Sequence, residues 1–114
     1  MMNKYELIIT IVNKDYASDL MEAAREVGAK GGTILNGRGT GGHEVEKLFG
    51  LTIQQEKEIV LILTEIQYKQ EIMKSIIQAT GLNTPGRGIC FSVPVEDVIG
   101  TSFSSLSSAE DSNN

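Results

Sequence analysis

Two short segments of this sequence combine glycine with arginine, and they are the residues best suited to bind an anion. The first covers residues 37–42 and reads GRGTGG, and the second covers residues 84–88 and reads TPGRG. Glycine lets backbone N–H groups approach a ligand closely, and a neighbouring guanidinium supplies a forked donor for phosphate or carboxylate. The pattern indicates two loops able to hold a phosphate group.

A plain loop is the other interpretation of each segment, because glycine also marks turns that bind nothing. The first segment lacks the Gly-Lys-Ser or Gly-Lys-Thr of a Walker A motif. It is also not a GxGxxG run that opens a helix inside a βαβ unit. Neither familiar nucleotide motif is present, so both interpretations stay open on these residues.

The sequence offers little for catalysis or for metal binding. Its only histidine, His43, lies in a polar stretch, and its only cysteine, Cys90, lies in an apolar run. A general base needs an orienting partner and a nucleophile within reach, whereas a buried free cysteine packs as a small apolar residue. One His and one Cys far apart lack the spacing of zinc ligands, and no Asp-rich calcium loop occurs. We therefore expect a protein that is not an enzyme, holds no metal and requires no cofactor.

The composition is that of one globular domain with an acidic balance. The chain has 114 residues, of which 40% are hydrophobic and 22% charged, with a formal net charge of −5. Nucleic acid is therefore an unfavoured partner, because binding its backbone depends on clustered Lys and Arg. No apolar run approaches the roughly 20 residues that span a bilayer, and no signal peptide precedes the apolar residues 7–12. We expect a cytoplasmic protein without direct membrane insertion.

Four runs of apolar and β-branched residues predict the strands that position the two loops. These runs are residues 5–12, 32–35, 58–63 and 89–93. The first is apolar on both alternations, as is typical of a central strand buried on two sides. The two glycine-arginine segments then follow the second strand and precede the fourth.

Apolar residues spaced by three and four predict a helix between the first two strands and another between the last two. We expect Asp15 to cap the first helix and Gly28 to end it, while Gly81 ends the second. The apolar stripes are Tyr16, Leu20, Met21, Ala24 and Val27 in the first helix, and Ile72, Met73, Ile76 and Ile77 in the second. The order βαββαβ predicts an α+β protein with the ferredoxin-like fold and an antiparallel sheet.

The composition changes after Gly100, where serine, acidic and amide residues replace the apolar ones. Such a segment has too little apolar surface to offset the entropy of ordering it. We therefore predict one folded domain over residues 1–100 and a Ser-rich disordered tail over residues 101–114.

Several of these landmarks occur in the same order as in the nitrogen regulatory P-II proteins, which residues 5–100 resemble. Residues 26–33 resemble the glycine-containing junction between the family's first helix and second strand. Gly-Thr-Gly at residues 39–41 resembles the Gly-x-Gly at the root of its long T-loop, and Gly-Arg-Gly at 86–88 resembles the Gly-Asp-Gly of its B-loop. Residues 91–96 resemble the strand that follows and the Pro-Val-Glu after it.

The resemblance implies a compact homotrimer that binds a small effector, an adenine nucleotide such as ATP, ADP or AMP, in the clefts between subunits. Effector binding changes the T-loop conformation and so regulates a partner, such as a transporter or a metabolic enzyme of nitrogen or carbon metabolism, without turnover. Transferred residue by residue, the nucleotide site consists of Thr33, Arg38, Gly39, Thr40, Gly41, Gly86, Arg87 and Gly88.

The chain departs from the family pattern in ways that bear on the ligand. No Gln that would hold metal and 2-oxoglutarate stands near His43, Arg87 replaces the B-loop Asp, and Ile89 replaces the Lys that follows its second glycine. The family's C-terminal Arg-rich stretch is absent, and residues 42–55 contain no Tyr or Ser to be modified. We expect Arg38 and Arg87 to supply part of the missing positive charge. The alternative is a trimeric interaction module that has lost nucleotide binding.

Overall fold

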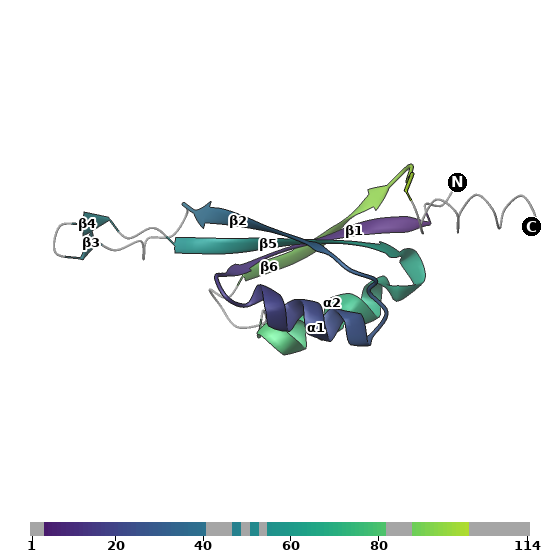
Figure 1. Cartoon of the computed structure of the whole chain (residues 1–114), viewed down its shortest axis with the longest axis horizontal. Helices are drawn as coiled ribbons and strands as arrows, with labels where there is room; N and C mark the ends of the chain where they lie inside the picture. Colours follow the sequence, from purple (N-terminus) through teal and green to yellow (C-terminus); the bar gives the residue numbers. More distant parts are fainter. Residues whose placement is uncertain (1–3, 41–46, 49–50, 53–54, 82–87, 101–114) are drawn as a thin grey trace, which may run out of the picture.

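The chain folds into an antiparallel sheet with two helices packed on one of its faces. The computed structural model describes residues 4–40, 47–48, 51–52, 55–81 and 88–100. In chain order the elements are β1 (Tyr5–Asn13), α1 (Ala17–Glu26), β2 (Thr33–Gly39), β3 (Lys47–Leu48), β4 (Leu51–Thr52), β5 (Gln55–Glu65), α2 (Ile66–Thr80) and β6 (Gly88–Val95). Figure 1 shows the long sheet above the two helices, with the small β3–β4 hairpin beyond one end. The predicted βαββαβ order and ferredoxin-like fold are confirmed, with this hairpin as an addition.

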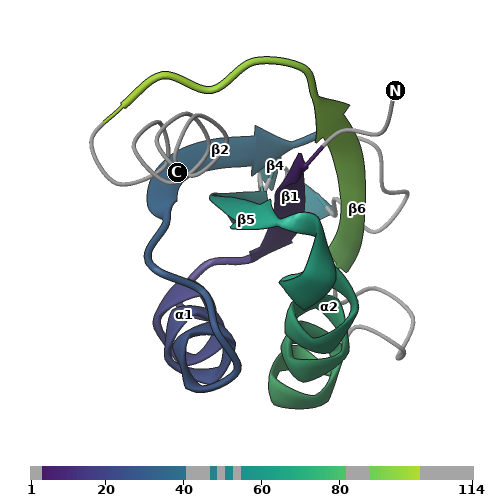
Figure 2. The same ribbon diagram turned by 90° about the vertical axis from the view of Figure 1, so that its right-hand side faces the viewer.

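The four long strands lie in the order β2-β5-β1-β6, and each neighbouring pair is antiparallel. β1 pairs with β5 over the whole length of β1, from Tyr5 opposite Glu65 to Asn13 opposite Lys57. Ile9 lies between Leu61 of β5 and Phe91 of β6. Because side chains alternate between the two faces of a strand, these three residues share one face. Figure 2 shows both helices on the other face.

The strands are longer than the sequence predicted. β2 does not stop near residue 35 but continues to Gly39, because its backbone pairs with β5 as far as Gly39 opposite Gln55. Gly37, Arg38 and Gly39 therefore belong to a strand, not to a loop, which corrects the expectation for that part of the first glycine-arginine segment. A four-residue estimate missed this extension because glycine and arginine have little intrinsic preference for strands.

The core lies between the sheet and the two helices. Ile8 of β1 and Ile62 of β5 are opposite each other and fully buried, and Leu20 of α1 and Ile72 of α2 are fully buried against them. Burying one such side chain stabilises the fold by about 1.5–3 kcal/mol. The predicted helical stripes supply this core, except that Ile77 at the end of the α2 stripe is 38% exposed.

The start of α1 is held by a strand, not by a neighbouring residue. Tyr16 is the N-cap and makes no side-chain capping bond, while Asp15, the predicted cap, has a φ of 81°. The Glu58 carboxylate of β5 takes over the capping role, since its Oε1 accepts the backbone N–H groups of Asp15 and Ala17 at 3.0 Å each. The prediction for Asp15 is therefore wrong.

Glycines end both helices, as predicted, but in different ways. Gly81 is the C-cap of α2 with a φ of 69°, the left-handed conformation that glycine adopts without a steric penalty. Gly28 lies one residue beyond the C-cap of α1 and has a φ of 120°. A Cβ at Gly28 would lie 2.9 Å from Cδ1 of Tyr68, so the α2 ring packs directly on this backbone. Among the residues that the structure describes, neither helix is long and apolar enough to cross a bilayer.

Candidate functional site

The described residues among those predicted to bind a nucleotide fall into two groups, Thr33 at one end of the sheet and the others at the opposite end. Thr33 begins β2, whereas Arg38 and Gly39 end it and Thr40 follows. A strand advances about 3.3 Å per residue, so Thr33 and Gly39 are about 20 Å apart. The remaining candidate of the second segment that the structure describes, Gly88, begins β6. Gly41, Gly86 and Arg87 lie outside the described residues.

The two glycine-arginine segments reach the same end of the sheet but at opposite edges. The register places Val12 between Gly88 and Glu58, and Glu58 is paired on its other side with Asn36. Strands are spaced by about 4.8 Å, so β2 and β6 are about 14 Å apart across this end. We call this end, where β2 stops and β5 and β6 begin, the loop end of the sheet.

Glycine at the loop end allows two β5 side chains to lie flat across β2. A Cβ on Gly37 would lie 2.9 Å from Cδ1 of Ile59, and a Cβ on Gly39 would lie 2.9 Å from Cε of Lys57. Both glycines therefore leave room for β5 side chains, which would have to shift if a larger residue stood at either position. This packing role is a reason for glycine at these positions that the sequence did not reveal.

An open cavity of about 430 Å³ lies beside the start of β2, at the end of the sheet opposite the loop end. It is lined by Leu7, Lys30, Gly31, Gly32, Thr33, Leu61 and Leu63. The three leucines provide an apolar wall, while the glycine and threonine backbone offers polar groups at the rim, a combination that suits a small organic ligand. Of these residues the sequence analysis named only Thr33 as a ligand-binding residue, although Lys30, Gly31 and Gly32 lie in the same junction, residues 26–33, that resembles the family.

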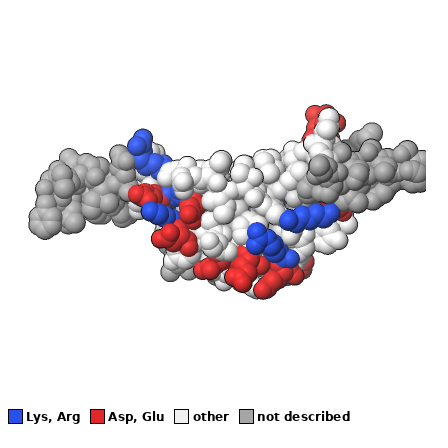
Figure 3. Space-filling model, viewed as in Figure 1, with Lys and Arg blue, Asp and Glu red and all other residues white. Residues whose placement is uncertain are grey.

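Charged side chains gather at the loop end on the face that carries the helices. Lys14 Nζ lies 3.0 Å from the Glu56 carboxylate, and the Lys14 backbone N–H donates to the Glu56 carbonyl at 3.1 Å. The hydrogen bond with Glu56 raises the pKa of Lys14 above its ordinary value. Arg38 is opposite Glu56 in the register, so it shares this neighbourhood. Figure 3 shows charges at this end and over the helices, with an uncharged surface between.

The sheet face away from the helices is apolar along most of its length. We call it the open apolar face; it consists of Leu7, Ile9, Ile11, Leu35, Ile59, Leu61, Leu63, Ile89, Phe91 and Val93. Four of these side chains remain well exposed: Leu35 at 46%, Ile89 at 55%, Phe91 at 39% and Val93 at 38%. β1 was predicted to be buried on two sides, and within one chain only one side is covered by helices.

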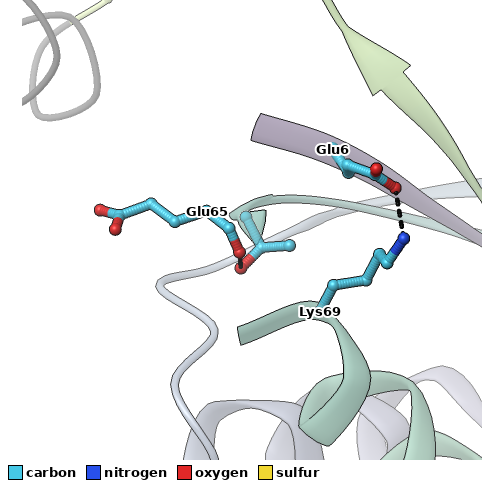
Figure 4. A network of polar contacts seen from close by, with 4 residues as sticks. Glu6, Glu65 and Lys69 are labelled. Carbon is cyan, nitrogen blue, oxygen red and sulfur yellow. Dashed lines mark hydrogen bonds and ion pairs between the residues drawn. The ribbon is translucent and has the colours of Figure 1, made fainter. Parts of the chain in front are cut away.

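Two polar contacts elsewhere hold the fold and do not extend the candidate site. Lys69 of α2 donates to Glu6 of β1 at 2.9 Å (Figure 4), and this bond, with a further one from Ser92, holds the pKa of Glu6 below its ordinary value. Thr10 donates to Cys90 Sγ at 3.4 Å, while burial raises the pKa of that thiol. Cys90 packs against the core, as predicted. No cluster of three or more metal-ligating side chains occurs among the residues that the structure describes.

Comparison with known proteins gives one family and one fold. The sequence profile of the nitrogen regulatory protein P-II family matches residues 5–102. No curated protein sequence matches the chain. Among solved structures, the crystal structure of Arabidopsis thaliana PII bound to citrate is similar, with a TM-score of 0.67 and 22% sequence identity over 87% of this chain and 84% of that chain. The structural match supports the ferredoxin-like fold described above.

Proposed function

Because the chain belongs to the nitrogen regulatory protein P-II family, we propose that it is a trimeric regulatory protein that binds an adenine nucleotide between its subunits. Nucleotide binding would alter residues 42–55, the counterpart of the T-loop, and so change the affinity for a partner protein such as a transporter or a metabolic enzyme. The protein acts by a shift between conformations, without chemical turnover.

The exposed open apolar face is the main support for assembly into a trimer. Ten apolar residues from four strands form one continuous surface, with exposures of 38% to 55% at its outer positions. A monomer rarely leaves so large an apolar surface in water, and burial against other copies removes it. Three copies packed by this face would give the closed symmetry that homo-oligomers favour.

The same arrangement supports a nucleotide site between subunits. The cavity at Thr33 borders the open apolar face, since it shares Leu7, Leu61 and Leu63 with that face. Its apolar wall suits a purine base, and the glycine-arginine segments suit phosphate groups. In one chain the cavity and Gly39 are about 20 Å apart along β2, so one nucleotide reaches both kinds of residue only if they come from different subunits.

The trimer is tested with a matched pair of substitutions. Val93 on the open apolar face and Ile77 on α2 are each 38% exposed. Val93→Asp places a charge in the subunit interface and should yield monomers by light scattering, whereas Ile77→Asp should leave the trimer intact. Far-ultraviolet circular dichroism of both variants shows whether the chain remains folded. A wild-type monomer, or a Val93→Asp trimer, refutes this mode of assembly.

The ligand is tested by calorimetry of the purified wild-type protein with ATP, ADP and AMP. Citrate is a useful further probe, because the similar Arabidopsis PII structure is bound to it. We expect at least one adenine nucleotide to bind. If none binds to a protein that is trimeric, the nucleotide part of the proposal is wrong.

That outcome would favour the second candidate, a trimeric interaction module without an effector. Ile89 supports it, because this residue stands where the resembling family has a phosphate-binding Lys, and it is an apolar residue 55% exposed on the open apolar face. The module would still bind its partner through residues 42–55. Partner capture that depends on these residues but not on nucleotide would distinguish it.

A further inference from the structure

The aromatic ring of Tyr68, in the first turn of α2, lies directly against the backbone that leads from α1 to β2. A Cβ at Gly28 would lie 2.9 Å from Cδ1, 3.4 Å from Cγ and 3.5 Å from Cε1 of this ring. Gly28 has a φ of 120°, a conformation that favours glycine, so the ring lies where the absence of a side chain leaves room. We call residues 28–33, which run from the end of α1 into β2, the α1–β2 junction.

The α1–β2 junction is packed at both ends and open between them. Near its start, Ala29 is 8% exposed and belongs to the core. Near its end, a Cβ at Gly32 would lie 2.8 Å from Sδ of Met21 and 3.0 Å from the carbonyl oxygen of Leu61, so this backbone lies tightly against α1 and β5. A Cβ at Gly31, by contrast, would have nothing within 4 Å. The open middle of the junction therefore takes its position from the packed ends.

Two neighbouring cavities connect Tyr68 with the candidate ligand site. The cavity at Thr33 and a smaller one lined by Gly28 and Tyr68 share Lys30 and Leu63 in their walls. Tyr68 lines the smaller cavity but not the larger one. A ligand in the cavity at Thr33 would contact the α1–β2 junction and not the Tyr68 ring, so Tyr68 acts on that ligand through the junction backbone.

We propose that Tyr68 is a positioning residue that holds the α1–β2 junction in the conformation that receives the purine base. The inference rests on the proposed function, in which the base occupies the cavity at Thr33. A junction already held by the ring does not have to be ordered when the ligand binds. Ordering a single backbone residue costs about a factor of ten in affinity, so the support from one ring is measurable.

The test uses calorimetry with ATP, ADP and AMP on the wild type and three variants. Tyr68→Ala removes the ring, whereas Tyr68→Phe keeps every ring atom that contacts Gly28 and removes the hydroxyl. Ile77→Ala is the matched control, because it truncates another α2 side chain of similar exposure, 38% against 40%, that lines neither cavity. Light scattering shows whether each variant is a trimer. If Tyr68→Ala does not assemble, Tyr68→Leu takes its place, since it keeps apolar volume without the flat ring.

We expect Tyr68→Ala to weaken the binding of ATP, ADP and AMP by the same factor, about tenfold, because the three ligands share the base and differ in their phosphates. The dependence of its affinity on KCl should match that of the wild type, since no charge has been removed. Without ligand, amide hydrogens of the α1–β2 junction should exchange faster than in the wild type. Tyr68→Phe should behave like the wild type. Ile77→Ala should keep wild-type affinity whatever stability it loses.

Three results overturn the proposal while leaving the nucleotide hypothesis intact. The first is a trimeric Tyr68→Ala protein that binds as tightly as the wild type. The second is a Tyr68→Phe protein that loses as much affinity as Tyr68→Ala, which would assign the effect to the hydroxyl. The third is a loss that differs between ATP and AMP, which would place the effect at the phosphates. A wild-type trimer that binds no nucleotide refutes the proposed function itself, and the role of Tyr68 falls with it.

Discussion

Glu58 is expected to stabilise the protein by capping a helix that begins 41 residues earlier in the chain. Its Oε1 accepts the backbone N–H groups of Asp15 and Ala17, at 3.0 Å each, while the N-cap residue Tyr16 makes no capping bond. The carboxylate thus satisfies two donors at the positive end of the α1 dipole. Removing a capping side chain typically costs 0.5–2 kcal/mol, so we expect Glu58→Ala to lower the free energy of unfolding by about 1–2 kcal/mol.

The assay is urea unfolding followed by circular dichroism at one fixed protein concentration, because the stability of an oligomer depends on concentration. Glu56→Ala is the matched control. Glu56 is two residues away on the same face of β5, but its carboxylate is 66% exposed and paired with a Lys14 side chain that is 58% exposed. Exposed ion pairs of this kind contribute little, so this control should unfold close to the wild-type midpoint.

Glu58→Gln refines the result, since the amide oxygen can still accept both N–H groups without the charge. It should lie between the wild type and Glu58→Ala. If Glu58→Ala unfolds at the same urea concentration as Glu56→Ala, the capping argument is wrong, and α1 is held by its buried apolar stripe without help from β5.

The Glu6–Lys69 pair and the end of α1 give two further predictions. The hydrogen bond from Lys69 lowers the folded pKa of Glu6, so its contribution is complete above the unfolded pKa and is lost as pH falls through the folded pKa. Lys69→Met should therefore be less stable than the wild type at pH 7 by about 1 kcal/mol and should lose less stability on acidification. The control is Lys74→Met, whose partner Glu71 is 4.0 Å away with both side chains 65% exposed, and its stability should stay close to that of the wild type. An acid unfolding profile of Lys69→Met parallel to that of the wild type would contradict this reasoning. Gly28→Ala should lower the free energy of unfolding by about 1–3 kcal/mol, because Gly28 has a φ of 120° and a Cβ there would lie 2.9 Å from the Tyr68 ring. The control is Gly31→Ala, which should unfold near the wild-type midpoint in the same urea assay, because a Cβ at Gly31 would have nothing within 4 Å.

Local patterns in the sequence were sufficient for the type and order of the main elements. The three-to-four spacings identified the apolar stripes of both helices, and five of these residues are buried in the core: Leu20, Met21, Ala24, Ile72 and Ile76. The C-cap at Gly81 was also predictable, because glycine has no Cβ and so adopts the left-handed conformation without a steric penalty. A structural feature that depends only on a residue and its neighbours in the chain can therefore be predicted from the residue types.

Predictions failed where a distant residue competes with a local preference. Asp15 does not cap α1, because Glu58, 43 residues away along the chain, already occupies the helix N-terminus. Gly37 and Gly39 read as loop residues, yet pairing with β5 extends the strand through them, and the Ile59 and Lys57 side chains use the space that a Cβ would fill. Neither partner is visible from the neighbouring sequence.

The sequence by itself determined a βαββαβ protein of the P-II family with two glycine-arginine segments, because periodicity and short motifs are local properties of the chain. Tertiary structure decided which face of the sheet the helices cover, and therefore which ten apolar side chains the helices leave uncovered. It also separated Thr33 from Gly39 by the length of β2 and placed the Lys57 side chain between Gly39 and Asn13. These placements follow from strand register and packing, which join residues that are far apart in the chain.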